Sequence, residues 1–166
     1  MRKLALLVWA LPVLAAFPLL CAAQAQFGDW VASKSNNILE AYTAIESGSQ
    51  FGILCMEKCV WYLDAQTKCV EHHEYPVLIN AEAGADYLSM RCFTLQYEGR
   101  TRYVYIFEEF DKIKNAASLG AQIGFAMPLE GSKFTVSRFS LSGYQGALSA
   151  LSRLRGHDVK FRDSTM

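Results

Sequence analysis

Cysteines, histidines and one pair of adjacent glutamates are the residues of this chain whose types and spacing could do chemistry. The chain has five cysteines and three histidines among 166 residues. Cys55, Cys59, Cys69 and Cys92 could pair as disulfides or supply thiolate ligands to a metal, whereas Cys21 lies apart from them near the N-terminus. The choice between these two chemistries depends on the compartment in which the chain folds.

A zinc site is one interpretation of these residues. Cys55, Cys59 and Cys69 are followed at once by His72 and His73, so soft and imidazole ligands lie close together in sequence. The spacing matches no standard zinc-binding pattern, however, and adjacent histidines on a strand point to opposite faces. A solvated loop is the simpler interpretation of the two histidines, and the sequence predicts no metal site.

Local geometry favours one of the three possible disulfide pairings. Strand-like residues flank the polar turn Met56-Glu57-Lys58 on both sides. A three-residue hairpin loop would place Cys55 opposite Cys59, within bridging distance, and would leave Cys69 to pair with Cys92. We therefore expect Cys55–Cys59 and Cys69–Cys92, although the sequence alone leaves the other pairings open.

The remaining residues form no catalytic constellation. A serine triad needs a nucleophile, a histidine and a carboxylate brought together, and the chain has no Gly-x-Ser-x-Gly elbow to present a serine. Glu108 and Glu109 could serve as the paired carboxylates of glycoside hydrolysis. A solvated helix start, favoured by the helix dipole, is the simpler interpretation of this pair. The sequence thus predicts no catalytic residue and no cofactor.

The first 25 residues have the features of a cleaved export signal. Arg2 and Lys3 precede an apolar run from Leu4 to Leu20, and Ala23-Gln24-Ala25 supplies the small-x-small pattern at which signal peptidase cuts. A transmembrane anchor is the alternative because the run approaches spanning length, but its two prolines disfavour a continuous helix. Cys21 could carry a lipid, although the leucine before it is larger than bacterial lipoproteins prefer at that position.

Cleavage after Ala25 leaves residues 26–166 with four cysteines, an even number that is typical of disulfide bonding in an exported chain. No repeat or linker divides this segment, so we expect a single β-rich domain that is periplasmic or secreted. The whole chain has a formal net charge of zero and 52% hydrophobic residues. This composition excludes the basic surface of a nucleic-acid-binding protein and the low hydrophobicity of a disordered one.

Short segments rich in β-branched and aromatic residues predominate in this domain, and glycines separate them. Strands do not alternate with helices, which excludes a dinucleotide-binding architecture. We expect mainly β structure, as an antiparallel β-sandwich or partly closed barrel with a C-terminal α-helix packed on it. The predicted strands are residues 39–45, 51–55, 60–64, 76–80, 88–97, 101–107, 122–127 and 133–139.

The clearest predicted hairpin joins residues 91–97 to 101–107. A three-residue loop places Phe93 on the face of Tyr105, whereas a two-residue loop would place it on the opposite face, because the strand period is two. The apolar pattern favours the three-residue loop. We expect the aromatic row from Tyr103 to Phe107 to be sheet core rather than a stacking platform for a ligand.

Two helices are predicted, over residues 108–119 and 143–155. The second has a continuous apolar stripe, which we expect to pack against the sheet, although a membrane surface or a partner protein could also cover it. Ser142 and Gln145 have the spacing of a capping box at its start, and Gly156 suits a left-handed exit at its end.

Three short segments carry further motifs: Phe27-Gly28-Asp29-Trp30 at the mature start, Ala126-Met127-Pro128-Leu129, and Phe139 to Leu151, which reads FSLSGYQGALSAL. Together they resemble the Gly-Asp-Trp start, the apolar-Pro-Leu strand entry and the closing segment of the invasion-associated locus B family of exported bacterial proteins. The chain differs from that family in having no cysteine soon after Trp30 and none after Cys92. The resemblance implies a non-enzymatic, β-sandwich-like protein of the periplasm or outer surface. A role in host-cell entry is implied by the family name.

We expect an exported binding protein without enzymatic activity, whose partner is a protein of the bacterial envelope or of a host cell. We expect neither a nucleic-acid partner nor a membrane span after cleavage. One alternative is a periplasmic inhibitor of a hydrolase such as lysozyme, with the Met56-Glu57-Lys58 turn as its inhibitory loop. Another is a small secreted hydrolase that uses Glu108 or Glu109.

Overall fold

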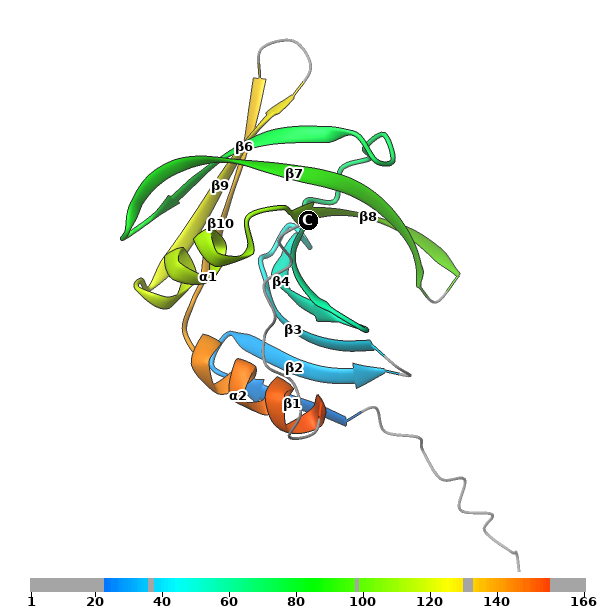
Figure 1. Cartoon of the computed structure of the whole chain (residues 1–166), viewed down its shortest axis with the longest axis vertical. Coiled ribbons are helices and arrows are strands. Elements are labelled where there is room, and N and C mark those ends of the chain that lie inside the picture. The colour runs from blue at the N-terminus through cyan, green and yellow to red at the C-terminus, as the bar shows by residue number, and fades with distance from the viewer. Residues whose placement is uncertain (1–22, 36–37, 98, 130–132, 156–166) are drawn as a thin grey trace, which may run out of the picture.

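Strands dominate the molecule and form one antiparallel sheet (Figure 1). The computed structural model describes residues 23–35, 38–97, 99–129 and 133–155. Residues 1–22 of the predicted export signal therefore lie outside the described residues. The strands are β1 (Ala23–Phe27), β2 (Trp30–Ser35), β3 (Ile38–Ala44), β4 (Gln50–Cys55), β5 (Cys59–Asp64), β6 (Glu74–Ala81), β7 (Gly84–Tyr97), β8 (Arg100–Phe107), β9 (Gln122–Leu129) and β10 (Lys133–Ser140).

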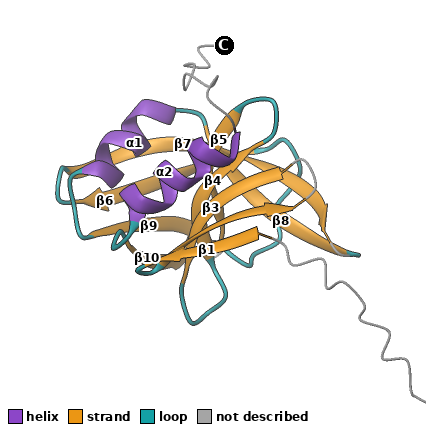
Figure 2. Cartoon of the chain, turned by 90° about the horizontal axis from the view of Figure 1, so that it is seen from below, coloured by secondary structure: helices purple, strands orange, loops and turns teal. Residues whose placement is uncertain are grey.

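The sheet curls into a half-barrel, and both helices lie on its inner side (Figures 1 and 2). The strand order is β1-β2-β3-β4-β5-β8-β7-β6-β9-β10. Helix α1 (Phe110–Ser118) packs against β5 and β9, and helix α2 (Tyr144–Arg155) packs against β1, β2 and β3. The predicted mainly β class, with a C-terminal helix packed on the sheet, is confirmed, and of the two predicted architectures the structure has the partly closed barrel and not the β-sandwich.

All eight predicted strands are present with small shifts at their ends, but β1 and β2 were not predicted. After Trp30 and Val31, strand β2 continues with small and polar residues, Ala-Ser-Lys-Ser, which do not predict a strand. It is fixed instead by the burial of Trp30 and Ala32 beneath α2. The cleavage site predicted after Ala25 lies within β1, so a chain cut there would keep only Gln26 and Phe27 of that strand.

The main core lies between the inner face of the sheet and the two helices. The ring of Phe51 is at its centre, stacked on Trp61 with a centroid separation of 5.1 Å and 4.9 Å from the ring of Phe125. Tyr105 and Phe107 are buried in the same core. The prediction of sheet core is therefore confirmed for these two residues, whereas Tyr103, the first residue of the predicted aromatic row, is half-buried and lies outside that core.

The β7–β8 hairpin has the register of a two-residue loop, so the predicted three-residue loop is wrong. Tyr97 pairs with Arg100, and Phe93 pairs with Val104. Because side chains alternate along a strand, Phe93 shares a face with Val104 and lies on the face opposite Tyr105.

A second apolar cluster on the outer face of the sheet is the physical reason for this register. Leu54, Tyr62 and Val104 are buried there, and Phe93 packs against them. The apolar residues of the hairpin therefore serve two cores, one on each face, whereas the predicted register assumed one. Glu98, within the turn, lies outside the described residues.

Polar groups beside this second cluster hold the hairpin on the sheet. The guanidinium of Arg102 donates hydrogen bonds to Asp64 at 3.0 Å and to Gln50 at 2.8 Å. On the same face, the hydroxyl of Tyr62 donates a hydrogen bond to the carboxylate of Glu40, which links β5 to β3 rather than to the hairpin. Burial, and secondarily the negative charge of Glu40, raise the pKa of Tyr62 well above its usual value.

Helix α2 begins at Tyr144, so the predicted capping box between Ser142 and Gln145 is out of register by one residue. Gly143 precedes the first turn and has a φ of +90°. A Cβ atom at Gly143 would lie 1.6 Å from the carbonyl oxygen of Phe27. The helix start is therefore set by close backbone packing against the N-terminal segment rather than by a serine side chain.

Candidate binding surface

The four cysteines after residue 25 form two disulfides, Cys55–Cys59 and Cys69–Cys92, which is the pairing that the sequence analysis favoured. Cys55 and Cys59 are directly opposed at the ends of β4 and β5, with their Cα atoms 4.0 Å apart. Cys69–Cys92 ties the loop before β6 to β7, with a Cα separation of 6.1 Å. The sulfur atoms that a zinc site would need are thus bonded to one another.

His72 and His73 lie in the exposed loop before β6 and contact different neighbours. The ring of His72 packs edge-on against Phe93 at 5.3 Å, and that of His73 packs against Tyr75 at 5.1 Å. Within the described ranges, no group of three or more histidine, cysteine, aspartate or glutamate side chains is placed to hold a metal ion.

Glu108 and Glu109, the candidate hydrolytic carboxylates, make contacts that join β7 to the start of α1. Glu108 accepts a hydrogen bond from the guanidinium of Arg91 at 2.7 Å, and the same guanidinium nitrogen contacts Glu74 at 2.8 Å. Glu109 accepts a hydrogen bond from the backbone amide of Ser89 at 3.3 Å. These contacts give both carboxylates a structural role.

The Met56-Glu57-Lys58 turn is held from two directions. The Cys55–Cys59 disulfide closes its base. Arg155, the last residue of α2, donates hydrogen bonds to the carbonyl oxygen of Glu57 and to the sulfur of Cys59. The end of α2 is thus attached to this turn, and the predicted helix exit at Gly156 lies outside the described residues.

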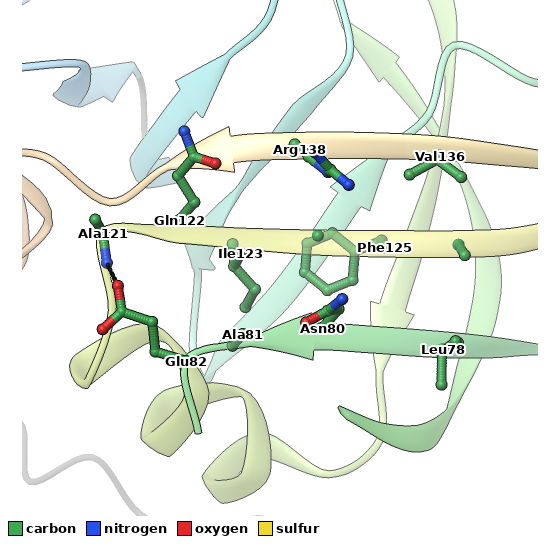
Figure 3. Close-up of a pocket in the computed structure, with 12 residues that line it drawn as sticks. Leu78, Asn80, Ala81, Glu82, Ala121, Gln122, Ile123, Phe125, Val136 and Arg138 are labelled. Carbon is green, nitrogen blue, oxygen red and sulfur yellow. Dashed lines mark hydrogen bonds between the residues drawn. The ribbon is translucent and has the colours of Figure 1, made fainter. Parts of the chain in front are cut away.

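A trough of about 440 Å³ lies on the outer face of β6, β9 and β10 (Figure 3). Its floor consists of small residues on the middle strand, β9, whereas larger side chains project from the strands on either side. This contrast in side-chain size between neighbouring strands creates the hollow. Two cross-strand rows make up the arrangement: Leu78, Ala126 and Val136, and Asn80, Gly124 and Arg138.

One end of the trough opens onto an apolar surface with a second hollow of about 370 Å³. Three large side chains on it are well exposed to solvent: Tyr87 at 71%, Phe134 at 68% and Val136 at 62%. We call this surface the outer-face patch. It consists of Pro76, Leu78, Tyr87, Ala126, Pro128, Phe134 and Val136.

The other end of the trough is polar. Glu82 accepts a hydrogen bond from the backbone amide of Ala121 at 3.0 Å, as Figure 3 shows. The exposed side chain of Arg138 lies beside Gly124. A Cβ atom placed on Gly124 would lie 3.6 Å from the Cγ atom of Arg138. Asn80 and Gln122 complete this end. The trough therefore offers a cation and amide groups next to an apolar surface.

None of the residues that line this trough is among the candidate functional residues predicted from the sequence. Strand β10 has apolar residues on both faces, with Phe139 buried in the core and Phe134 and Val136 exposed on the opposite side. Apolar residues on both faces of a strand can indicate either burial on both sides or an exposed binding face. The sequence of β10 thus contains this pattern, but only the position of the strand in the sheet decides whether it reflects burial on both faces or an exposed binding face.

Within the described part of the chain, neither helix is long and apolar enough to cross a membrane.

The half-barrel occurs in a solved structure, the crystal structure of invasion associated protein B from Bartonella henselae. The two structures match with a TM-score of 0.56 and 13% sequence identity, over 81% of this chain and 99% of that one. No protein-family model and no curated protein sequence matches the chain. The chain is thus similar in fold to an invasion associated protein B, at a sequence identity too low to show more than the fold.

Proposed function

We propose that this chain is an exported bacterial protein that acts by binding a protein partner, in the cell envelope or on a host cell, through the outer-face patch. The main support for the proposal is that Tyr87, Phe134 and Val136 are exposed together on the apolar surface next to the trough. Contiguous apolar surface of this kind on a soluble protein is typical of an interaction site. Aromatic residues are also enriched at the cores of protein interfaces.

Export is supported by three independent features of the chain. The first 25 residues have the pattern of a signal peptide. The remaining cysteines pair in two disulfides, which persist in oxidising compartments. The fold is similar to that of a bacterial invasion associated protein B.

The chemistry of the trough supports binding rather than catalysis. Among the described residues that line it there is no histidine, cysteine or serine. Its one carboxylate, on Glu82, is engaged with the amide of Ala121. A nucleophile next to a general base, the usual sign of a hydrolytic site, is therefore not found among these lining residues.

A capture experiment with matched variants tests the proposal. The purified chain is immobilised and exposed to the envelope fraction of the producing bacterium and, separately, to host-cell membranes. The test variant is Phe134→Gln/Val136→Thr, and the control is Leu119→Gln/Val70→Thr, whose two residues are similarly exposed outside the patch, at 65% and 68%. Loss of a retained protein in the test variant alone supports the proposal, whereas retention by both variants contradicts it.

Inhibition of a hydrolase is a second candidate function, favoured by the rigid Met56-Glu57-Lys58 turn. The disulfide and Arg155 hold this turn from both sides, and Met56, its first residue, is 55% exposed. A preorganised exposed loop suits insertion into an enzyme cleft because little conformational entropy is lost on binding. The test is inhibition of a muramidase by the chain. The Met56→Ser/Lys58→Gln variant should relieve inhibition, and the patch variant should not.

A further inference from the structure

We propose that the partner adds an extended strand to β10, with an acidic side chain opposite Arg138 and apolar side chains opposite Val136 and Phe134. This inference rests on the proposed function and specifies the chemistry of the partner segment. It follows from three features: the place of β10 in the sheet, the side chains that β10 exposes, and the absence of a complementary segment on the chain's own edge strands.

Strand β10 is the last strand in the sheet order, and in the described part of the chain β9 is the one strand that pairs with it. Strand β10 also contacts β3 across the curl of the sheet, and its Ser140 end is held by the indole of Trp30. Backbone amides and carbonyls along the free side of an edge strand form a template for another strand. Proteins usually protect such edges with proline, charges or bulges. Between Phe134 and Ser137, β10 carries no charged residue and no proline, and its pairing with β9 is continuous over all eight residues. Lys133 and Arg138 flank this stretch, so a strand added here must complement a cation rather than an uncharged edge.

Alternate side chains of β10 form an apolar, apolar, cationic series on the outer face. Phe134, Val136 and Arg138 all point away from the core and are exposed, whereas Ser137 and Phe139 are buried on the inner face. A strand added beside β10 would present every second side chain on the same outer face. Apolar side chains would then cover Phe134 and Val136, and a carboxylate would complement Arg138.

The direction of the added strand determines the order of these residues. Every strand pair of the sheet is antiparallel, and antiparallel pairing is the slightly more stable arrangement. A strand antiparallel to β10 passes Arg138 first, then Val136, then Phe134. The partner segment therefore reads acidic-x-apolar-x-apolar from its N-terminus.

A second copy of this chain does not supply that pattern from either edge of its sheet. Two β10 strands paired antiparallel about Val136 would place Arg138 opposite Phe134, with no carboxylate opposite the guanidinium. The other edge strand, β1, has the sequence Ala-Gln-Ala-Gln-Phe and no acidic residue. Charge complementarity thus favours a different protein as the partner.

Binding of labelled peptides to the full chain, measured by fluorescence polarisation, tests the inference. The probe is Thr-Glu-Thr-Val-Thr-Phe-Thr, and the control is the same peptide with its glutamate and valine exchanged, Thr-Val-Thr-Glu-Thr-Phe-Thr. We expect the probe to bind about fivefold more tightly than the control, since the exchange removes the carboxylate from its place opposite Arg138 in either strand direction. In Arg138→Glu, a probe with lysine in place of glutamate should bind better than the original probe, which reverses the wild-type preference. Equal binding of probe and control, or an unchanged preference in Arg138→Glu, overturns the inference.

N-methylated probes separate strand addition from docking of side chains alone. In an antiparallel pair, the amides of alternate residues face the neighbouring strand and the others face away. Two probes are methylated, one at the amides of glutamate, valine and phenylalanine and the other at those of the inner threonines. Strand addition predicts that one of them loses binding and the other keeps it.

Equal behaviour of the two methylated probes overturns strand addition. If partner capture still depends on Phe134 and Val136, the proposed function survives that result, so the failures of the two proposals are distinguishable. Self-association is checked by sedimentation. If the chain forms a dimer that the Val136→Lys substitution dissociates, and if the probe does not bind, then a second copy of the chain occupies the edge of β10. That result also overturns the inference.

Discussion

The indole nitrogen of Trp30 donates a hydrogen bond to the carbonyl oxygen of Ser140 at 2.8 Å, across 110 residues of sequence. This contact joins the start of β2 to the end of β10 and so links the two ends of the curled sheet. The Trp30 ring also packs edge-on against Tyr144 of α2, at a centroid distance of 5.2 Å. Nearby, the amide of Asp29 donates to the carbonyl of Ser142 at 3.0 Å. Two of the three motif segments noted in the sequence thus meet at the closure of the half-barrel.

Replacing Trp30 with phenylalanine should destabilise the fold by about 3 kcal/mol, because the change removes buried volume and leaves the Ser140 carbonyl without its donor. Trp30 is fully buried. Urea unfolding followed by circular dichroism measures the effect. Tyr87→Phe is the matched aromatic control, and it should change stability by less than about 0.5 kcal/mol because Tyr87 is exposed. Similar losses in the two variants would contradict a special role for the Trp30 contact.

Two glycine-to-alanine substitutions separate the effect of close packing from that of backbone conformation. Gly143 and Gly84 both have positive φ, at +90° and +116°. A Cβ at Gly143 would collide with Phe27, whereas at Gly84 nothing lies within 4 Å. Gly84→Ala should therefore cost only the backbone strain, about 1 to 2 kcal/mol, and Gly143→Ala substantially more. Thermal unfolding of both variants checks the order, and equal costs would exclude the close approach of Gly143 to Phe27.

Replacing Arg102 with methionine should destabilise the fold by about 3 kcal/mol, because it leaves the buried carboxylate of Asp64 without its cation. The Asp64 side chain is 4% exposed in this ion pair. Lys112→Met is the control, since Lys112 and Asp86 form an exposed ion pair, which solvent screens and which should contribute little to stability. Denaturant unfolding of the two variants measures both values. A cost for Arg102→Met no larger than that for Lys112→Met would show that the β7–β8 hairpin is held in another way.

The fold should lose stability at alkaline pH. Burial raises the pKa of Tyr105 and of Tyr144 from 10.0 to about 12. The folded state favours the neutral phenol, so each of these tyrosines contributes to the free energy of unfolding. This stabilisation is fully present below pH 10 and is lost as the pH rises toward about 12. The free energy of unfolding, measured in urea at a series of pH values, should fall in this window. The decline should be shallower in Tyr105→Phe/Tyr144→Phe, and an unchanged slope in that variant would assign the loss to other groups.

The positions of most strands and the mainly β fold class could be predicted from the sequence because local composition determines them. Runs such as Phe51–Cys55 are rich in the residues that suit a pleated, buried surface. The Cys55–Cys59 bridge was predictable for the same reason, since a short turn alone sets its geometry. Strand β2 was missed because Trp30 and Ala32 are buried by a helix that lies more than a hundred residues later in the chain.

The candidate site could not be predicted because it depends on the order of strands rather than on any one strand. The trough exists because β9, with Gly124 and Ala126, lies between β6 and β10, and no local pattern determines that neighbourhood. Likewise, the exposure of Phe134 follows from the place of β10 at the edge of the sheet. The register of the β7–β8 hairpin was missed for a related reason, since a second core on the outer face competes for Phe93.

Photo-crosslinking from single positions tests whether the outer-face patch is the surface that binds the partner. A benzophenone amino acid replaces Val136 in the patch or, as the control, Val70, which is similarly exposed elsewhere. Each chain is irradiated in the envelope fraction or with host-cell membranes, and crosslinked proteins are identified by mass spectrometry. We expect a discrete crosslinked partner from position 136 and none from position 70. A partner that crosslinks from position 70 alone, or equally from both positions, would contradict this expectation.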